Sequence, residues 1–231
     1  MPIVDIPSGA RGLTGYLAVP AAGRGPGVVL VQEWWGIVPH IRSVADRLAD
    51  AGFVTLAPDF FRGVQTTEPD EAGKLMMGLQ VAQAGADIAA AADHLVRSGL
   101  LTGTHTGCVG FCMGGGLALL APTVTPDIDC AVAFYPAMPW PDYHPAWAQY
   151  AGKEALVHQC EADLPTTSEQ IGLYVEEIAA HDGVAIVETD VGTQHAFFND
   201  DRPEVHDPRA SALAWERTLG FLHRRLDGPF R

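Results

Sequence analysis

The chain has 231 residues, of which 48% are hydrophobic, and a formal net charge of −14 at pH 7. This length and composition suffice for one substantial core, so we expect a single domain over residues 1–231. The acidic surplus argues against nucleic acid as a partner, because neutralising phosphates requires clustered Lys and Arg.

The amino terminus and the cysteines indicate the compartment. Residues 1–5 (MPIVD) are neither basic nor followed by a long apolar stretch, so we expect no signal peptide, no membrane span and a cytoplasmic location. The cysteines have no CxxC or Cys/His spacing, which predicts free thiols and no metal site. They are Cys108, Cys112, Cys130 and Cys160.

Strand and helix signals alternate along the chain. Two short runs at 1–6 and 13–19 predict an antiparallel hairpin at a sheet edge. The elements that follow are predicted as a strand at 27–31, a helix at 41–51, a strand at 53–57, a helical stretch at 71–96, a strand at 106–111, a helix at 113–120, strands at 129–135 and 155–160, a helix at 168–181, a strand at 185–189 and a helix at 208–226.

This alternation predicts an α/β fold of the three-layer sandwich type. Right-handed βαβ crossovers give a mostly parallel central sheet with helices on both faces, and no separate lid domain is expected. The long helical stretch should break near Gly78 or Gly85, because glycine is unfavourable inside a helix.

The most informative stretch is Gly110-Phe111-Cys112-Met113-Gly114, where a predicted strand gives way to a predicted helix. A G-x-S-x-G turn holds its central residue in a strained conformation that small neighbours permit. Here a cysteine is central, and the N-terminus of the following helix would favour a thiolate and a developing oxyanion. Cys112 is therefore the candidate nucleophile. The alternative is a small buried side chain between closely packed glycines.

A base and an acid are expected in loops after later strands. His195 lies between the last predicted strand and the final helix, at the carboxyl edge of the sheet. Asp163 follows the preceding predicted strand, whereas Glu161 could still belong to that strand and point away. The order Cys112, Asp163, His195 suits this fold. An ordinary loop histidine and a solvated carboxylate are the alternatives.

Four ordered segments resemble those of the dienelactone hydrolase (carboxymethylenebutenolidase) family of α/β-hydrolases. They are Gln32-Glu33 with Gly36, the run GFCMGG at 110–115, Asp163, and His195-Ala196-Phe197. The resemblance runs from about Gly12 to the final helix. It implies that Cys112, Asp163 and His195 form a catalytic triad.

The resemblance also implies roles for residues near the first buried strand. Glu33 would interact with the resting thiol and hold it until substrate enters. The backbone N–H groups of Trp34 and Met113 would form the oxyanion hole. From the residues alone, a carboxylate directly after a buried strand already indicates a site or a satisfied polar network.

Substrate recognition departs from the family pattern. Members that act on dienelactone hold the substrate carboxylate with arginines, one after the second buried strand and one shortly after the catalytic histidine. No arginine lies between Arg62 and Arg97 or in the six residues after His195. Dienelactone is therefore not the expected substrate, although Lys74 and Arg62 stay open as anion partners. Aromatic residues predict a more apolar pocket, formed by Trp35, Phe60, Tyr135, Trp140 and Phe197.

The sequence thus predicts a hydrolase of small carboxylic esters or lactones that forms a thioacyl-enzyme on Cys112. No metal or organic cofactor is expected, and the partners would be a small-molecule substrate and, at most, a second copy of the chain. Two other classes stay open. One is a thiol-dependent acyltransferase or redox protein, although no resolving cysteine lies nearby in sequence. The other is an inactive small-molecule-binding α/β domain.

Overall fold

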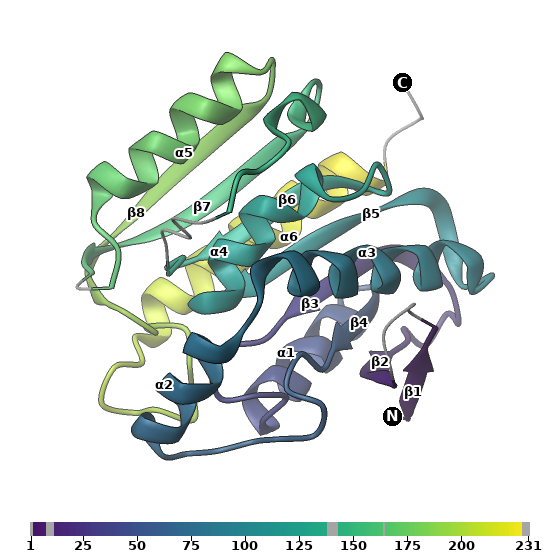
Figure 1. Cartoon of the computed structure of the whole chain (residues 1–231), viewed down its shortest axis with the longest axis horizontal. Helices are drawn as coiled ribbons and strands as arrows, with labels where there is room; N and C mark the ends of the chain where they lie inside the picture. The colour runs from purple at the N-terminus through teal and green to yellow at the C-terminus, as the bar shows by residue number, and fades with distance from the viewer. Residues whose placement is uncertain (1, 8–11, 138–142, 164, 228–231) are drawn as a thin grey trace.

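The computed structural model describes residues 2–7, 12–137, 143–163 and 165–227. In these ranges one sheet runs in the order β1-β2-β4-β3-β5-β6-β7-β8 (Figure 1). Its strands are β1 (Ile3–Ile6), β2 (Leu13–Ala18), β3 (Gly25–Val31), β4 (Val54–Pro58), β5 (Leu101–Phe111), β6 (Ile128–Phe134), β7 (Glu154–Ala162) and β8 (Val184–Gln194). Only the pairs β1·β2 and β2·β4 are antiparallel within this sheet. The edge hairpin and the mostly parallel sheet are confirmed.

Helices cover both faces of the sheet. They are α1 (Pro39–Asp50), α2 (Pro69–Gly78), α3 (Val81–Arg97), α4 (Met113–Leu120), α5 (Ser168–Ala180) and α6 (Pro208–Leu226). In Figure 1, α3 and α4 lie in front of the sheet and α1 and α6 behind it. The guanidinium of Arg47 in α1 lies 5.2 Å from the ring of Trp215 in α6, which joins the two rear helices. The predicted three-layer α/β sandwich is confirmed.

The predicted break in the helical stretch at 71–96 occurs at one of its two candidate glycines. Helix α2 ends at Gly78, whereas Gly85 lies inside α3. A Cβ atom at Gly85 would lie 3.0 Å from Cγ1 of Val124, so this glycine serves close packing rather than termination. Packing thus outweighs the low helix propensity of glycine at this position.

Four strands are longer than the sequence predicted, and β5 and β8 differ most. Strand β5 begins at Leu101 rather than at residue 106, and β8 continues to Gln194 rather than ending at Thr189. The added segments are polar and glycine-containing, so no hydrophobic pattern marks them. They join the sheet through backbone pairing with neighbours, as Ala162 and Gln194 do at the ends of β7 and β8.

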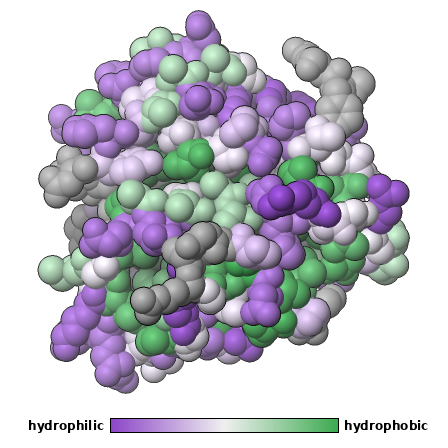
Figure 2. Space-filling model, turned by 45° about the vertical axis from the view of Figure 1, so that its right-hand side comes forward, coloured by the Kyte–Doolittle hydropathy of each residue, from purple (hydrophilic) through white to green (hydrophobic). Residues whose placement is uncertain are grey.

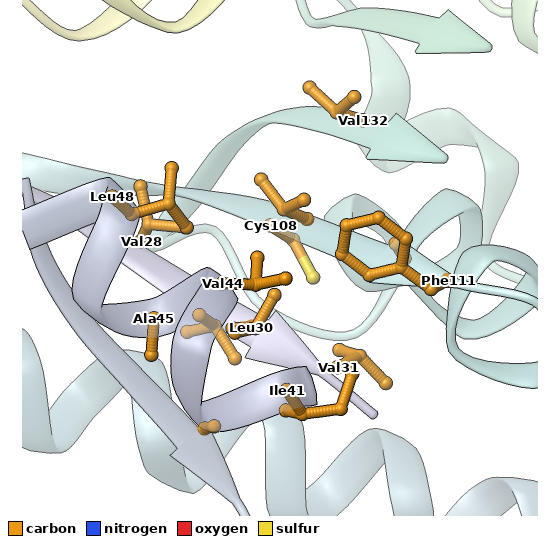
Figure 3. Close-up of a cluster of buried hydrophobic side chains, with 14 of the residues drawn as sticks. Val28, Leu30, Val31, Ile41, Val44, Ala45, Leu48, Cys108, Phe111 and Val132 are labelled. Atoms are coloured by element: carbon orange, nitrogen blue, oxygen red, sulfur yellow. The ribbon is translucent and has the colours of Figure 1, made fainter. Parts of the chain in front are cut away.

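The core between β3 and α1 fixes the end of β3 against the rest of the sheet. Branched side chains of β3 point at the apolar face of α1, and Cys108 and Phe111 of β5 lie beside them (Figure 3). All of these side chains are fully buried. The labelled members are Val28, Leu30, Val31, Ile41, Val44, Ala45, Leu48, Cys108, Phe111 and Val132.

The surface mixes polar and apolar side chains. On the face in Figure 2, apolar residues reach the surface between hydrophilic ones. Across the ranges that the structure describes, none of the helices combines the length and the apolarity needed to cross a bilayer.

Two glycines let β3, β5 and α4 approach one another closely. A Cβ atom at Gly110 would lie 2.0 Å from the carbonyl oxygen of Gly114. A Cβ atom at Gly114 would lie 2.4 Å from the carbonyl oxygen of Gln32. Because both obstacles are backbone atoms, no residue larger than glycine fits at position 110 or at position 114 without moving the sheet.

We expect Gly114→Ala to destabilise the fold by more than about 2 kcal/mol, since the new methyl group meets backbone that cannot turn aside. Urea denaturation followed by circular dichroism measures this loss. The matched control is Gly220→Ala in α6, where an added Cβ meets nothing within 4 Å. That change should be neutral or stabilising by up to about 1 kcal/mol. Equal effects of the two substitutions would contradict the close-approach argument.

Candidate active site

Five polar or nucleophilic side chains follow the carboxyl ends of parallel strands. They are Glu33 after β3, Cys112 after β5, Tyr135 after β6, Asp163 after β7 and His195 after β8. The carboxyl ends of parallel strands meet at one edge of the sheet, where α/β proteins bind their ligands. The sheet therefore collects residues from the whole length of the chain at one place.

Cys112 occupies the sharp turn between β5 and α4. Its backbone has φ 55° and ψ −120°, a conformation that non-glycine residues rarely adopt. Hydrogen bonds hold it there: its N–H donates to the carbonyl of Phe134 at 3.1 Å, and its carbonyl accepts from Gly115 at 2.9 Å and from Ala137 at 2.8 Å. Such strain persists only where the surroundings fix it, and it is common at functional sites. The strained turn predicted from the sequence is confirmed.

The structure brings His195 and Asp163 together, as the sequence predicted. The Nδ1 atom of His195 lies 2.9 Å from Oδ1 of Asp163 and 3.2 Å from Oδ2. The Asp163 side chain is 2% exposed and that of His195 is 19% exposed. With Nδ1 bonded to the carboxylate, the Nε2 edge of the ring is left for proton transfer.

The surroundings of His195 favour its charged form. Burial disfavours the imidazolium, but hydrogen bonding to Asp163 and interaction with Cys112 outweigh it and raise the pKa of His195 to about 10. The Nε2 atom is buried and makes no hydrogen bond of standard geometry to the described residues. Its contact with Cys112 is thus looser than the one to Asp163.

Glu33 is buried, and both of its carboxylate oxygens accept hydrogen bonds. The Tyr135 hydroxyl donates to Oε1 at 3.2 Å, and Nδ2 of Asn199 donates to Oε2 at 2.8 Å. Burial and then the negative charge of Glu33 raise the pKa of Tyr135 well above 10, so its hydroxyl remains a donor. Sequence reasoning missed Asn199. The one feature of the sequence that could have indicated Asn199 is a polar amide directly after the apolar run Ala196-Phe197-Phe198.

Cys160 is a free, buried thiol. It also contacts the site, because its thiol donates to Oδ2 of Asp163 at 3.4 Å. Ligand atoms of Cys160, Asp163 and His195 lie within 4.8 Å of one another, a spacing that could suit a cation. Burial and the charge of Asp163 raise the pKa of Cys160 far above that of an ordinary thiol, however. Hydrogen bonds already account for this cluster, because the Cys160 thiol donates to Asp163 and Asp163 bonds Nδ1 of His195.

A cavity connects the nucleophile and the base. Its empty volume, including space open to solvent, is about 470 Å³. The lining residues are Glu33, Trp34, Trp35, Met76, Cys112, Ala137, Pro165, His195, Ala196 and Arg202. Cys112 and His195 thus face the same space.

The structure modifies the predicted pocket. Trp35 lines the cavity. Its ring packs edge-on against that of Trp34, with 4.9 Å between the ring centroids. Phe60, Tyr135 and Phe197 lie in the hydrophobic core instead. Trp140 falls outside the described residues. Aromatic content near a loop does not distinguish a cavity wall from the packing beneath it.

The cationic residues are also arranged differently from what the sequence indicated. Arg62 is held by Asp87 at 2.7 Å, and Lys74 is exposed. Arg202 lines the cavity, although it lies too far past His195 to match the family pattern. Its Nε donates to Glu204 at 2.9 Å. A guanidinium is therefore present where sequence spacing gave no reason to expect one.

Comparison with known proteins identifies the family. Residues 13–226 match the model of the dienelactone hydrolase family. The chain belongs to the dienelactone hydrolase family. As a member of this family, it is a hydrolase that acts on carboxylic ester bonds.

Relatives of this dienelactone hydrolase family member match it over nearly their full lengths. "Protein usf" of Aquifex pyrophilus is 33% identical over 226 residues, which cover 92% of this chain and 93% of the relative. A "Putative carboxymethylenebutenolidase" of Aquifex aeolicus is 30% identical with the same coverage. The crystal structure of a "Putative Dienelactone Hydrolase" from Klebsiella pneumoniae matches with a TM-score of 0.85 and 25% identity, over 96% of this chain and 98% of that one.

The raised pKa of His195 predicts how the stability of this dienelactone hydrolase family member depends on pH. The folded state holds the His195 proton more tightly than the unfolded chain does, where the pKa is about 6.5. This contribution to stability is complete below about pH 6.5 and is lost as the pH rises toward 10. We expect Asp163→Asn to weaken that loss, because it removes a main cause of the raised pKa.

Urea denaturation between pH 6 and 10 tests this expectation. The control is Glu169→Gln, which makes the same chemical change at an exposed position in the first turn of α5. It should follow the wild-type curve. Parallel curves for Asp163→Asn and the wild type would mean that Asp163 does not set the His195 proton affinity.

Proposed function

We propose that this protein hydrolyses small esters or lactones by nucleophilic catalysis, with Cys112 as nucleophile, His195 as general acid and base, and Asp163 as the group that orients His195. One observation carries this proposal. A cysteine on a strained strand-to-helix turn and a histidine bonded to a buried aspartate line one cavity. This is the arrangement of nucleophile, base and orienting group that acyl transfer requires.

The first half of the reaction acylates the enzyme. Nε2 of His195 takes the proton of the Cys112 thiol, the sulfur attacks the carbonyl carbon, and the π electrons of the carbonyl move onto its oxygen. The tetrahedral intermediate then collapses and expels the alkoxide, which takes the proton from Nε2 of His195. In a lactone the alcohol stays attached to the acyl group. The product is a thioester on Cys112.

The second half releases the acid. His195 takes a proton from water, and the resulting hydroxide attacks the thioester carbonyl. Collapse of this intermediate expels the Cys112 thiolate and leaves a carboxylic acid. The enzyme returns to its starting state.

Backbone amides are proposed to stabilise both intermediates. Met113 is the first residue of α4, and the first N–H groups of a helix lack intrahelical acceptors. Trp34 approaches from the loop after β3 and lines the same cavity. Donors of this kind typically contribute factors of about 10² to 10³ in kcat.

The other cysteines do not favour thiol redox chemistry. Cys108 and Cys130 are fully buried, and burial raises the pKa of both thiols far above the ordinary value. Cys160 donates its hydrogen to Asp163. Within the described part of the chain, none of the three is an accessible, ionised partner for a disulfide with Cys112.

Cys112→Ala is expected to abolish the burst of p-nitrophenolate from p-nitrophenyl acetate and to leave turnover near the uncatalysed rate, since no thioester can form. The wild type should carry an acetyl group on the peptide that contains Cys112, as seen by mass spectrometry after rapid acid quenching. Cys108→Ala, a change in the core on the strand that leads to Cys112, is the control and should keep the burst. Undiminished hydrolysis by Cys112→Ala would exclude this nucleophile.

Arg202 is proposed to be the partner of any substrate carboxylate. Arg202→Gln should lower kcat/KM about tenfold or more for an ester that carries a carboxylate, because a charge-assisted hydrogen bond contributes about 1.5 to 3 kcal/mol. It should change kcat/KM for the matched neutral ester less than about twofold. Arg209→Gln, at an exposed position of α6, is the control. Equal losses on both esters would rule out a role for Arg202 in anion recognition.

A further inference from the structure

We propose that Asn199 is a positioning residue that, together with Tyr135, holds Glu33 in one orientation, so that Glu33 acts as a fixed negative charge beside the nucleophile and His195 takes the thiol proton. This inference rests on the proposed function. It departs from the role that the family resemblance implies for Glu33, which is to hold the resting thiol.

The amide of Asn199 has its orientation set by two hydrogen bonds. Its Oδ1 atom accepts from the backbone N–H of Asp201 at 3.1 Å. Its Nδ2 atom must therefore point the other way, where it donates to Oε2 of Glu33 at 2.8 Å. Asn199 is 2% exposed, so water does not compete for this bond.

Hydrogen bonds connect the loop that carries Asn199 to two helices, α6 and α1. The carbonyl of Phe197 accepts from the Ser211 hydroxyl of α6 at 3.0 Å. The carboxylate of Asp200 is bonded to Nδ1 of His40 in α1 at 2.8 Å. These contacts flank Asn199 in sequence and hold the backbone from which its amide reaches Glu33.

Glu33 is held by neutral donors. Tyr135 and Asn199 supply one hydrogen bond to each oxygen, and no ion pair involves Glu33 in the part of the chain that the structure describes. No ion pair among these residues therefore neutralises its charge directly, although Arg202, which is bonded to Glu204, lines the same cavity. A fixed anion at the wall of a cavity shared with Cys112 and His195 favours the protonated imidazole and disfavours a lone thiolate, so the thiol ionises only as the partner of protonated His195.

Loss of the Asn199 amide would change which group the carboxylate bonds. Oε2 of Glu33 would be buried without its donor, which is costly for a carboxylate. The Cys112 thiol offers a hydrogen in the same cavity. Glu33 would then accept that hydrogen and compete with His195, which keeps the thiol protonated to higher pH.

The test is a double-mutant cycle with four proteins: the wild type, Asn199→Ala, Glu33→Gln, and the double variant. The rate of Cys112 alkylation by iodoacetamide is measured against pH, and the labelled peptide is identified by mass spectrometry. We expect Asn199→Ala to move the midpoint up by about one pH unit, which is a tenfold slower reaction below it. In the Glu33→Gln background the same substitution should move the midpoint by less than about 0.3 unit.

Ser211→Ala is the matched control, because it loosens the same loop without removing a donor from Glu33. Because it removes one of the two contacts that hold this loop but leaves the Asn199 donor in place, its midpoint should move by less than about 0.3 unit, far less than that of Asn199→Ala. An unchanged midpoint in Asn199→Ala, or an equal shift in the Glu33→Gln background, would overturn the proposal. Tyr135→Phe removes the other donor and should shift the midpoint in the same direction, so a poorly folded Asn199→Ala does not prevent a decision.

Alkylation reports on the thiol whether or not the protein turns over an ester. A normal alkylation profile without any ester hydrolysis would count against the proposed function. A normal hydrolysis rate with no midpoint shift in Asn199→Ala would count against the role of Asn199 alone.

Discussion

The close approach of β3, β5 and α4 is the constraint on which the rest of the site depends. Glycine at 110 and at 114 lets these elements meet with no side chain between their backbones. The chain must then turn sharply at Cys112, which takes up a strained conformation and is 8% exposed as a residue. Tyr135 and Ala196 also have positive φ, so three strained residues border the same sheet edge. The rigid sheet supplies the contacts that keep them strained.

Much of this architecture could be predicted because its signals are local in sequence. Buried parallel strands appear as short apolar runs, and α6 (Pro208–Leu226) was predicted with its observed bounds, since proline begins it and a regular apolar face continues through it. The glycines around Cys112 mark the turn in the same way. Asp163 and His195 follow strands directly, so fold order alone indicated that they would meet.

The remaining features depend on contacts between distant parts of the chain. Asn199 bonds Glu33 across 166 sequence positions, and no pattern near either residue predicts that pairing. Arg202 reaches the cavity because of the path of a loop without regular structure. Phe60 and Phe197 appear equally suited to a pocket and to a core until the fold decides between them. The polar ends of β5 and β8 were not predicted, because backbone pairing rather than hydrophobicity brings them into the sheet.

The position of β8 at the outer edge of the sheet has a consequence for heat resistance. This strand ends one residue before His195 and pairs on one side only, with β7, through a register that shifts between Cys160 and Ala162. Border strands open more readily than central ones, since fewer neighbours hold them. Warming should therefore displace the imidazole while the middle of the molecule is still intact. Inactivation is then expected to be a local event that precedes melting.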